Sequence, residues 1–597
     1  MALGGAQHWQ SGAFAAVIHF ATAGMTLSPH RQFRVQPFNH LQKAVTTMDH
    51  KRNLLIAALA VISYLLLLAW NKDYQTPAPT PVPVTTVSTS QTQSLDLPAA
   101  PTAGSGGVPA QAAASAASSQ PTLISVQTPN QKVLIDTIGG DIVSLSLPRY
   151  PTSIDAPGDA FTLLKNDSTG VYVAQSGLIG RNGPDANGTG RPRYTSQQTA
   201  YSIDSGELSV DLTTTTAENV SIVKRFIFSA DDYLIRQQFI ITNQGASDWS
   251  TNLFGQIKRD ATKLASNGMR LNNFLGAAMT SEDDPYIKVK FDDIDDGEEP
   301  INMAGGWIAF SQHYFLGAWI PAATDQNTFS VRRNDRGEYL LGFVTQERSV
   351  APGASLTLES SFWAGPKNQD RLEEIAPNLG LTIDYGMLWF VAYPIFHLLS
   401  WINALVGNYG VAIILLTVVI RTLFYPLSAK QFASQAGMKR LQPKIAQLKD
   451  RYGDDKQALM QAQMELWKKE KVSPFSGCLP MFLQMPVFLG IYWVLNESVE
   501  LRQAPFMLWY QDLSALDPYF ILPILLGGVY FLQQHMNPMP TTDPVQARMM
   551  KFMPIIFSVF FLWFPAGLVL YYLANALLGI LQQWYFNSRL KTVTADN

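Results

Sequence analysis

The run GVAIILLTVVIRTLFYPLSAKQ, residues Gly410 to Gln431, carries one arginine inside an apolar segment of membrane length. An arginine at the centre of a membrane helix costs about 2.5 to 3.5 kcal/mol on insertion scales, and its side chain usually faces protein or a water-filled cavity rather than lipid. Thr417 lies one helical turn before Arg421 and shares its helix face. The run therefore predicts a membrane helix and marks Arg421 as the leading functional residue.

The composition around this run is that of a membrane protein with a sizeable soluble part. The chain has 597 residues, of which 47% are hydrophobic and 15% charged, and it is too long for one domain. Residues 122–377 contain 21 Lys and Arg against 31 Asp and Glu, a net charge of −10, whereas residues 428–472 contain 10 against 5, a net charge of +5. This asymmetry predicts different compartments for the two segments.

The N-terminal part contains another apolar run, MDHKRNLLIAALAVISYLLLLAW, which begins at Met48 with basic residues before its apolar core. It predicts an uncleaved signal anchor over residues 48–74, with a cleaved signal peptide as the alternative. Residues 1–47 contain no acidic side chain and no strong period, so we expect a spurious or disordered extension. Pro, Ala, Ser, Thr and Gly dominate residues 75–121, which predicts a disordered linker.

Apolar and polar residues alternate with period two across residues 122–367. Examples are LSVDLTTTT (208–216), SIVKRFIF (221–228), YLIRQQFIIT (233–242) and LTLESSFW (356–363). Such runs, bounded by turn clusters, predict antiparallel sheets packed as a large β-sandwich. The acidic stretch from Ser281 to Glu299 lacks the ligand spacing of a calcium-binding loop, and we interpret it as a solvated loop.

The C-terminal part alternates apolar and charged runs, and with the signal anchor it predicts six transmembrane helices, five of them forming a core. We expect amphipathic interfacial helices at 368–408, spans at 409–428, 473–496, 519–535, 552–565 and 566–587, a cytoplasmic helical hairpin at 429–472, a periplasmic loop at 497–518, a cytoplasmic loop at 536–551 and a tail at 588–597. A short spanning helix is the alternative for residues 387–406. The positive-inside rule places the basic hairpin and both chain termini in the cytoplasm.

Six polar side chains inside the predicted spans are weighed as candidates: Thr417, Arg421, Gln484, Ser558, Tyr571 and Tyr572. For Arg421 the alternatives are a wet interior cavity and snorkelling to the interface. Gln484 also suits a hydrogen bond between helices, and the tyrosines suit an interfacial aromatic belt. No phosphate loop, HExxH pair or GxSxG elbow is present, which argues against an enzyme. The single cysteine, Cys478, excludes an intramolecular disulfide, and we predict no cofactor and no metal.

Long motifs resemble the YidC/oxidase-assembly family of membrane protein insertases. They are YPLSAKQ, LQPKIAQLKDRYGDDKQ, KVSPFSGCLPMFLQMPVFLGIYWVL, SVELRQAPFMLW, DLSALDPYFILPIL and FMPIIFSVFFLWFPAGLVLYY. GLIGRNGPD and GGWIAFSQHYFLGAWIP extend the resemblance into the β-rich region, so that it covers about residues 54–588 and indicates the Gram-negative type with a large periplasmic domain.

This resemblance implies a function, a location and partners. The expected protein is an insertase and chaperone of the bacterial inner membrane, not an enzyme, which inserts and helps fold membrane proteins alone or with the Sec translocon. The outer domain would be a periplasmic β-supersandwich. The expected partners are nascent membrane proteins, the Sec translocon, the ribosome, the signal-recognition receptor and membrane lipids, without sequence-specific nucleic acid.

The resemblance also implies site residues. A substrate groove would contain Arg421 with Thr417 and Tyr571 or Tyr572 beside it, and we add Gln484 to this set. Substrate helices would slide along Met485, Pro486, Phe488 and Phe560. The hairpin would recruit substrates through basic residues, for which we name Lys439, Arg440 and Lys444.

The residues alone leave another class of function open. A small-solute transporter or channel would use Arg421 as an anion site, but it predicts an internal inverted repeat that the sequence does not show. An intramembrane hydrolase would need a base beside Ser558, and the predicted span 552–565 that carries Ser558 contains no His, Asp or Lys for that role.

Overall fold

The computed structural model describes residues 96–98, 122–186, 190–260, 274–296, 299–453, 455–470, 479–536 and 544–595. All of them belong to one compact unit, Val87–Asn597. The predicted extension at 1–47 and the signal anchor at 48–74 lie outside the described residues, and so does the linker except for Asp96, Leu97 and Pro98.

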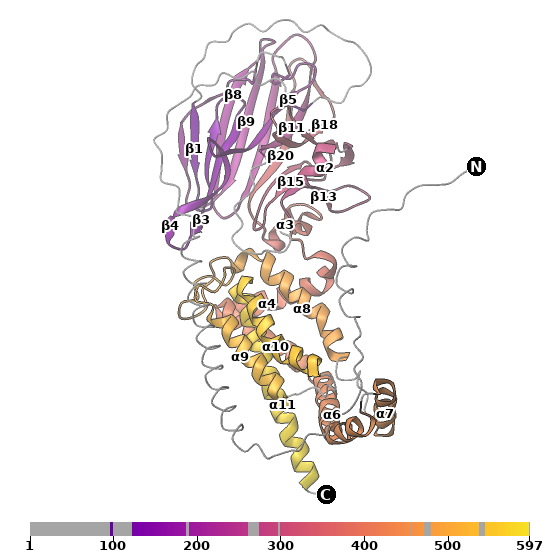
Figure 1. Ribbon diagram of the computed structural model, residues 1–597. Coiled ribbons are helices and arrows are strands. Elements are labelled where there is room, and N and C mark those ends of the chain that lie inside the picture. Colours follow the sequence, from indigo (N-terminus) through magenta and orange to yellow (C-terminus); the bar gives the residue numbers. More distant parts are fainter. Residues whose placement is uncertain are drawn as a thin grey trace, which may run out of the picture. The chain divides into compact units, whose positions relative to one another are not determined.

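Two sheets form the predicted β-sandwich (Figure 1). The 11-stranded sheet has the order β14 (Ile301–Ala304), β17 (Gln326–Arg333), β18 (Tyr339–Thr345), β11 (Trp249–Arg259), β5 (Gly170–Ile179), β4 (Ala156–Asp167), β3 (Asp141–Ser153), β2 (Lys132–Asp136), β1 (Leu123–Gln127) and β7 (Ala200–Ser202), with β19 (Arg348–Val350) paired to β11. The 9-stranded sheet has the order β13 (Ile287–Val289), β12 (Gly276–Met279), β15 (Ile308–Ser311), β16 (Phe315–Pro321), β20 (Ser355–Pro366), β10 (Leu234–Asn243), β9 (Val220–Ser229), β8 (Glu207–Thr215) and β6 (Thr195–Ser196).

The four runs quoted from the sequence are β8, β9, β10 and β20, which confirms the strand prediction for them. These strands are antiparallel neighbours, with Phe239 of β10 opposite Lys224 of β9 and Leu358 of β20. Burial alternates along β9, so that Ile222, Phe226 and other residues of one face enter the core. The period-two pattern therefore predicted which side chains fill the sandwich.

Two predictions in this region are wrong in part. The acidic stretch is not a plain loop, because it contains β13 and the short helix α2 (Phe291–Asp296). Asp293 accepts a hydrogen bond from the backbone N–H of Lys290, 3.1 Å away, at the start of that helix. The linker is also held at one point, because the backbone oxygen of Asp96 accepts hydrogen bonds from Gln256 and Arg332 of the sandwich.

The C-terminal part is helical. Its elements are α3 (Gln369–Ile375), the 3₁₀ turns η1 (Leu379–Thr382) and η2 (Gly386–Leu388), α4 (Trp389–Val406), α5 (Tyr409–Leu423), α6 (Tyr425–Tyr452), α7 (Lys456–Lys469), α8 (Leu479–Glu497), η4 (Val499–Leu501), α9 (Ile521–Met536), α10 (Pro544–Phe560), η5 (Phe561–Trp563) and α11 (Ala566–Ala595). Gly407, with a φ of 67°, ends α4, and Asn408 caps α5 by accepting a hydrogen bond from Val411.

The arginine-bearing helix α5 ends at Leu423, earlier than the predicted boundary at residue 428. The axis then bends by 68° into α6. Pro426 lies at the first positions of α6 and has no N–H to continue the hydrogen bonds of α5, which gives the break a local cause. Pro443 lies inside α6.

By length and composition, the described part of the chain has two helices that are able to cross a membrane, Gly386–Val406 and Ala566–Ser588. The bent pair α5 and α6 makes a third if it counts as one span, and Ile521–Met536 and Phe552–Trp563 are shorter apolar segments. Residues 386–406 thus have the length required by the spanning alternative to an interfacial helix. The six-span count stays a prediction.

Candidate functional site

Arg421 lies in the last turn of α5, and its side chain is bound by α11. The guanidinium Nε donates to Oδ1 of Asn575 over 2.6 Å, and Nη2 donates to the backbone oxygen of Asn575 over 2.9 Å. One turn further along α11, a Cβ added to Gly579 would lie 3.2 Å from Nη2. The side chain of Gln582 donates to the backbone oxygen of Arg421 over 3.1 Å. Helix α11 therefore holds both the side chain and the backbone of this residue.

Aromatic side chains complete the surroundings of Arg421. Tyr571 of α11 and Tyr530 of α9 lie close enough to interact electrostatically with the guanidinium. Tyr571 is fully buried, and its hydroxyl has no hydrogen-bond partner among the described residues. Within the same described ranges Arg421 makes no ion pair with a carboxylate. The site is therefore a positive charge set among neutral polar groups of α5, α9 and α11.

The other predicted groove residues, Thr417, Gln484 and Tyr572, do not all lie beside the Arg421 guanidinium. Thr417 is fully buried, and its hydroxyl donates to the backbone oxygen of Ile413 over 2.6 Å, within its own helix. Gln484 is half-buried on α8. Tyr572 is buried and packs edge-on against Phe488 of α8, with ring centroids 4.2 Å apart. The structure thus brings Arg421 and Tyr571 together, while Tyr572 links α11 to α8.

The predicted sliding residues form part of an apolar surface on α8 and α10. Met485 is 48% exposed and Phe560 is 46% exposed. Pro486 and Phe488 of α8 are half-buried. Exposed apolar side chains on membrane helices are suited to contact with lipid or with another apolar helix.

The predicted recruiting residues of the hairpin are partly used by the fold. Lys439 donates to the backbone oxygen of Met536 at the end of α9. Lys444 forms an ion pair with Glu470, which joins α6 to the end of α7. Arg440 is exposed. Lys444 is exposed as well, with 53% of its side chain accessible, so Arg440 and Lys444 are both open to solvent and Lys439 is half-buried.

Sequence reasoning missed Tyr530, Asn575 and Gln582. Asn575 and Gln582 lie four and eleven residues after Tyr571, at spacings that return to one helix face. A count of polar side chains along that face of residues 566–587 would have found both. Tyr530 gives no such signal, because its contact with Arg421 depends on how α9 packs.

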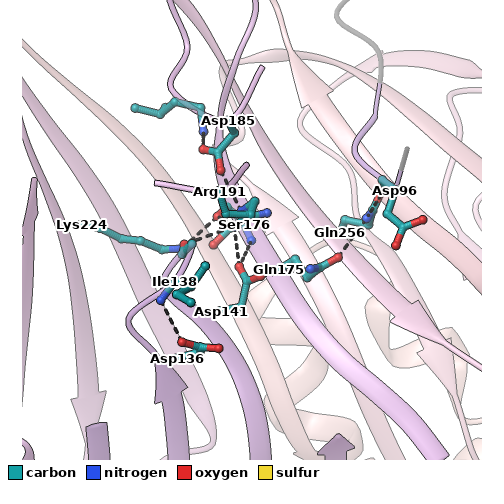
Figure 2. Close-up of polar contacts among 12 residues, drawn as sticks. Asp96, Asp136, Ile138, Asp141, Gln175, Ser176, Asp185, Arg191, Lys224 and Gln256 are labelled. Atoms are coloured by element: carbon teal, nitrogen blue, oxygen red, sulfur yellow. Dashed lines mark hydrogen bonds and ion pairs between the residues drawn. The ribbon is translucent and has the colours of Figure 1, made fainter. Parts of the chain in front are cut away.

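A different charged cluster lies inside the β-sandwich (Figure 2). Arg191 pairs with Asp141 at 2.6 Å and with Asp185 at 2.8 Å, and all three side chains are at most 9% exposed. Lys224 donates to the backbone oxygens of Gly139 and Ser176, each over 2.9 Å. Burial lowers the pKa of Lys224 to about 7 and raises the pKa of Asp185. The two carboxylates are paired with Arg191 inside the sandwich, and Lys224 is bound to backbone oxygens. We therefore keep Arg421 as the candidate site.

The fold and the site define a class of protein: a polytopic membrane protein that carries a β-sandwich domain and holds an arginine between membrane helices. Family models agree with this class, since residues 123–398 match the YidC periplasmic domain and residues 401–593 match the 60Kd inner membrane protein. The chain belongs to the family of the membrane protein insertase YidC.

Relatives with the name membrane protein insertase YidC support the assignment of this chain to the family. The membrane protein insertase YidC of Pseudomonas putida strain W619 is 48% identical over 556 residues, which cover 92% of this chain and 99% of the relative. The protein of the same name from Stutzerimonas stutzeri strain A1501 is 48% identical over 554 residues, which cover 91% of this chain and 99% of the relative. A crystal structure of an active YidC insertase matches 79% of this chain and 93% of its own chain, at 17% identity and a TM-score of 0.36.

Proposed function

We propose that this chain inserts and helps fold inner-membrane proteins through a hydrophilic groove around Arg421, alone or with the Sec translocon. The observation that carries the proposal is a guanidinium fixed between helices without an acidic partner among the described residues. A nascent polar segment that enters from the cytoplasm would be solvated beside this charge, so that less of its desolvation penalty arises at once. Transfer of the client's apolar helix into lipid supplies the net driving force.

The client helix would leave along α8 and α10. Met485 and Phe560 expose nearly half of their surfaces, and Phe488 contacts Tyr572 beside the arginine site. Methionine adapts its shape to irregular apolar partners, which suits a surface that accepts many sequences. In this proposal Met485, Pro486, Phe488 and Phe560 form the sliding surface, with Thr417, Gln484 and Tyr572 at the groove.

The hairpin α6 and α7 would receive clients in the cytoplasm, together with the ribosome and the signal-recognition receptor. Its segment 428–472 carries a net charge of +5, and Arg440 is exposed on it. By the positive-inside rule, this charge supports a cytoplasmic hairpin and cytoplasmic termini, with the β-sandwich in the periplasm.

The test compares Arg421→Ala with wild type in reconstituted vesicles that lack the Sec translocon. Two single-span clients share one apolar helix and differ in a short external tail, which is acidic in one and neutral in the other. We expect Arg421→Ala to slow insertion of the acidic-tailed client by about tenfold, the factor that roughly 1.4 kcal/mol represents. Arg421→Lys retains part of the rate, because the charge remains but the two-point geometry of the guanidinium is lost.

Leu423→Ala is the matched control, since Leu423 lies two residues away in α5 and is 73% exposed. It is expected to insert both clients at the wild-type rate. Equal insertion of the acidic-tailed client by Arg421→Ala and wild type would show that the arginine plays no part in the reaction.

A further inference from the structure

Asn575 is the residue on which the geometry of Arg421 depends. Its side-chain oxygen binds Nε and its backbone oxygen binds Nη2, so one residue holds one edge of the guanidinium. A helical carbonyl oxygen has two lone pairs, which allows it to bind Nη2 in addition to its partner within the helix. Both bonds leave the Nη1 amino group of Arg421 for other acceptors.

Three residues on successive turns of helix α11 contribute to the contact with Arg421. Asn575, Gly579 and Gln582 follow one another at spacings of four and three residues, so they share one helix face. The missing side chain at Gly579 lets the guanidinium lie against the helix, because an added Cβ would be 3.2 Å from Nη2. Gln582 binds the backbone oxygen of Arg421, one of the last carbonyls of α5 that have no partner within their own helix.

The chemistry of the acceptor has a consequence for charge. A carboxylate at this position would bind the guanidinium more strongly, but it would cancel the positive charge. An amide oxygen fixes the guanidinium and leaves the charge intact. The choice of acceptor therefore decides whether the site still attracts an acidic segment.

We infer that Asn575 is the positioning residue of Arg421, a neutral acceptor that orients the guanidinium for acidic client segments without neutralising it. The inference rests on the proposed function of Arg421 and assigns the site's preference for acidic tails to a residue of α11. Gly579 makes room for this arrangement.

The experiment uses the full chain in vesicles and measures the ratio of insertion rates for the acidic-tailed and neutral-tailed clients. Asn575→Asp keeps the acceptor and the shape but adds a negative charge, and it is expected to lower the ratio by about tenfold, as Arg421→Ala does. Asn575→Leu keeps the charge but loses the acceptor, and we expect a decrease of about fivefold, the factor of a typical net hydrogen bond. Leu577→Ala, on the exposed face of α11, is the control and should leave the ratio unchanged.

A double mutant separates positioning from simple packing. If Asn575 acts through Arg421, Arg421→Ala with Asn575→Asp has the same ratio as Arg421→Ala alone. A helix-packing role would lower insertion of both clients equally and leave their ratio intact, which would overturn the inference. An unchanged ratio in Asn575→Asp, beside a reduced one in Arg421→Ala, would overturn it too while leaving the proposed function in place.

An unchanged ratio in Arg421→Ala would instead contradict the proposed function, so the two failures are distinguishable. If Asn575→Asp does not accumulate in the membrane, Asn575→Leu and Gly579→Ala decide the matter. The alanine is expected to displace Nη2 and lower the ratio in the same direction, and a wild-type ratio in both variants would refute the inference.

Discussion

Lys224 places an amino group in the interior of the β-sandwich, facing Asp141, Asp185 and Arg191. Its two acceptors, the backbone oxygens of Gly139 and Ser176, also accept hydrogen bonds from Nη2 of Arg191, at 3.1 and 2.9 Å. Removal of the lysine therefore leaves both carbonyls with a donor. Removal of Arg191 would instead leave two buried carboxylates without their main partner, which is the costly case.

We expect Lys224→Met to make the β-sandwich less sensitive to pH. Burial lowers the native pKa of Lys224 to about 7, below its ordinary value of 10.5. Between these values the unfolded state binds more protons, so wild-type stability increases with pH, by up to about 1.4 kcal/mol per unit. The variant lacks this contribution, and its stability relative to wild type should increase as the pH falls from 9 to 7.

Unfolding midpoints at pH 7, 8 and 9, followed through the buried tryptophans, measure this effect. Lys132→Met, at an exposed position of β2, is the control and should keep the wild-type slope. Parallel pH dependence in Lys224→Met and wild type would show that the lysine does not titrate as its burial implies.

Helices α9 and α10 meet at a pair of glycines with contrasting surroundings. A Cβ on Gly527 would lie 2.6 Å from the hydroxyl oxygen of Ser558 and 2.7 Å from its Cβ, whereas a Cβ on Gly528 would meet nothing within 4 Å. The Ser558 hydroxyl donates to the backbone oxygen of Pro523 over 2.7 Å. Ser558, which the sequence offered as a nucleophile, thus serves the contact between these two helices.

Alanine at the two glycines should therefore have opposite effects on thermal stability. Gly528→Ala is expected to gain up to about 1 kcal/mol, because alanine favours the helix more than glycine does. Gly527→Ala meets Ser558 and should lose roughly 1 to 3 kcal/mol through overpacking. Unfolding of the purified variants in detergent gives both shifts, and shifts of equal sign and size would contradict the close approach of α9 and α10.

Elements with a strong local period were predictable from the sequence. Strand β9 alternates buried and less buried residues over its whole length, and the predicted boundary between residues 565 and 566 coincides with the start of α11 at Ala566. Other features depend on partners far away in the chain. Arg421 and Asn575 are 154 residues apart, and the docking of Asp96 involves residues more than 150 positions later. No local pattern encodes such pairs, so the sequence indicated a charged site but not the residue that holds it.

At the scale of the whole molecule, Asp96 fastens the linker to the β-sandwich. Its carboxylate pairs with Lys258 at 3.0 Å and accepts a hydrogen bond from Asn334 at 2.9 Å. Burial alone would raise the pKa of Asp96, but the hydrogen bonds from Lys258 and Asn334 outweigh it, and the pKa is lowered. The docked segment is therefore held by charge as well as by its backbone.

Asp96→Ala should release this segment. We expect faster proteolytic cleavage near residues 96–98, with an unchanged unfolding midpoint of the β-sandwich, because cleavage follows local opening. Asp335→Ala, a change in the loop between β17 and β18, is the control. Identical cleavage rates in Asp96→Ala and wild type would show that the carboxylate does not hold the linker.

The early end of α5 has a further consequence for the arginine. Since the helix stops at Leu423, Arg421 lies in its last turn, where the aligned peptide dipoles present their negative end. A cation at that position is stabilised by about 0.3 to 1 kcal/mol, and by more when it is partly buried. The same residue moved one turn back, to position 417, would lose this compensation. The proline that bends the chain after Phe424 thus also reduces the cost of keeping a permanent charge in an apolar helix.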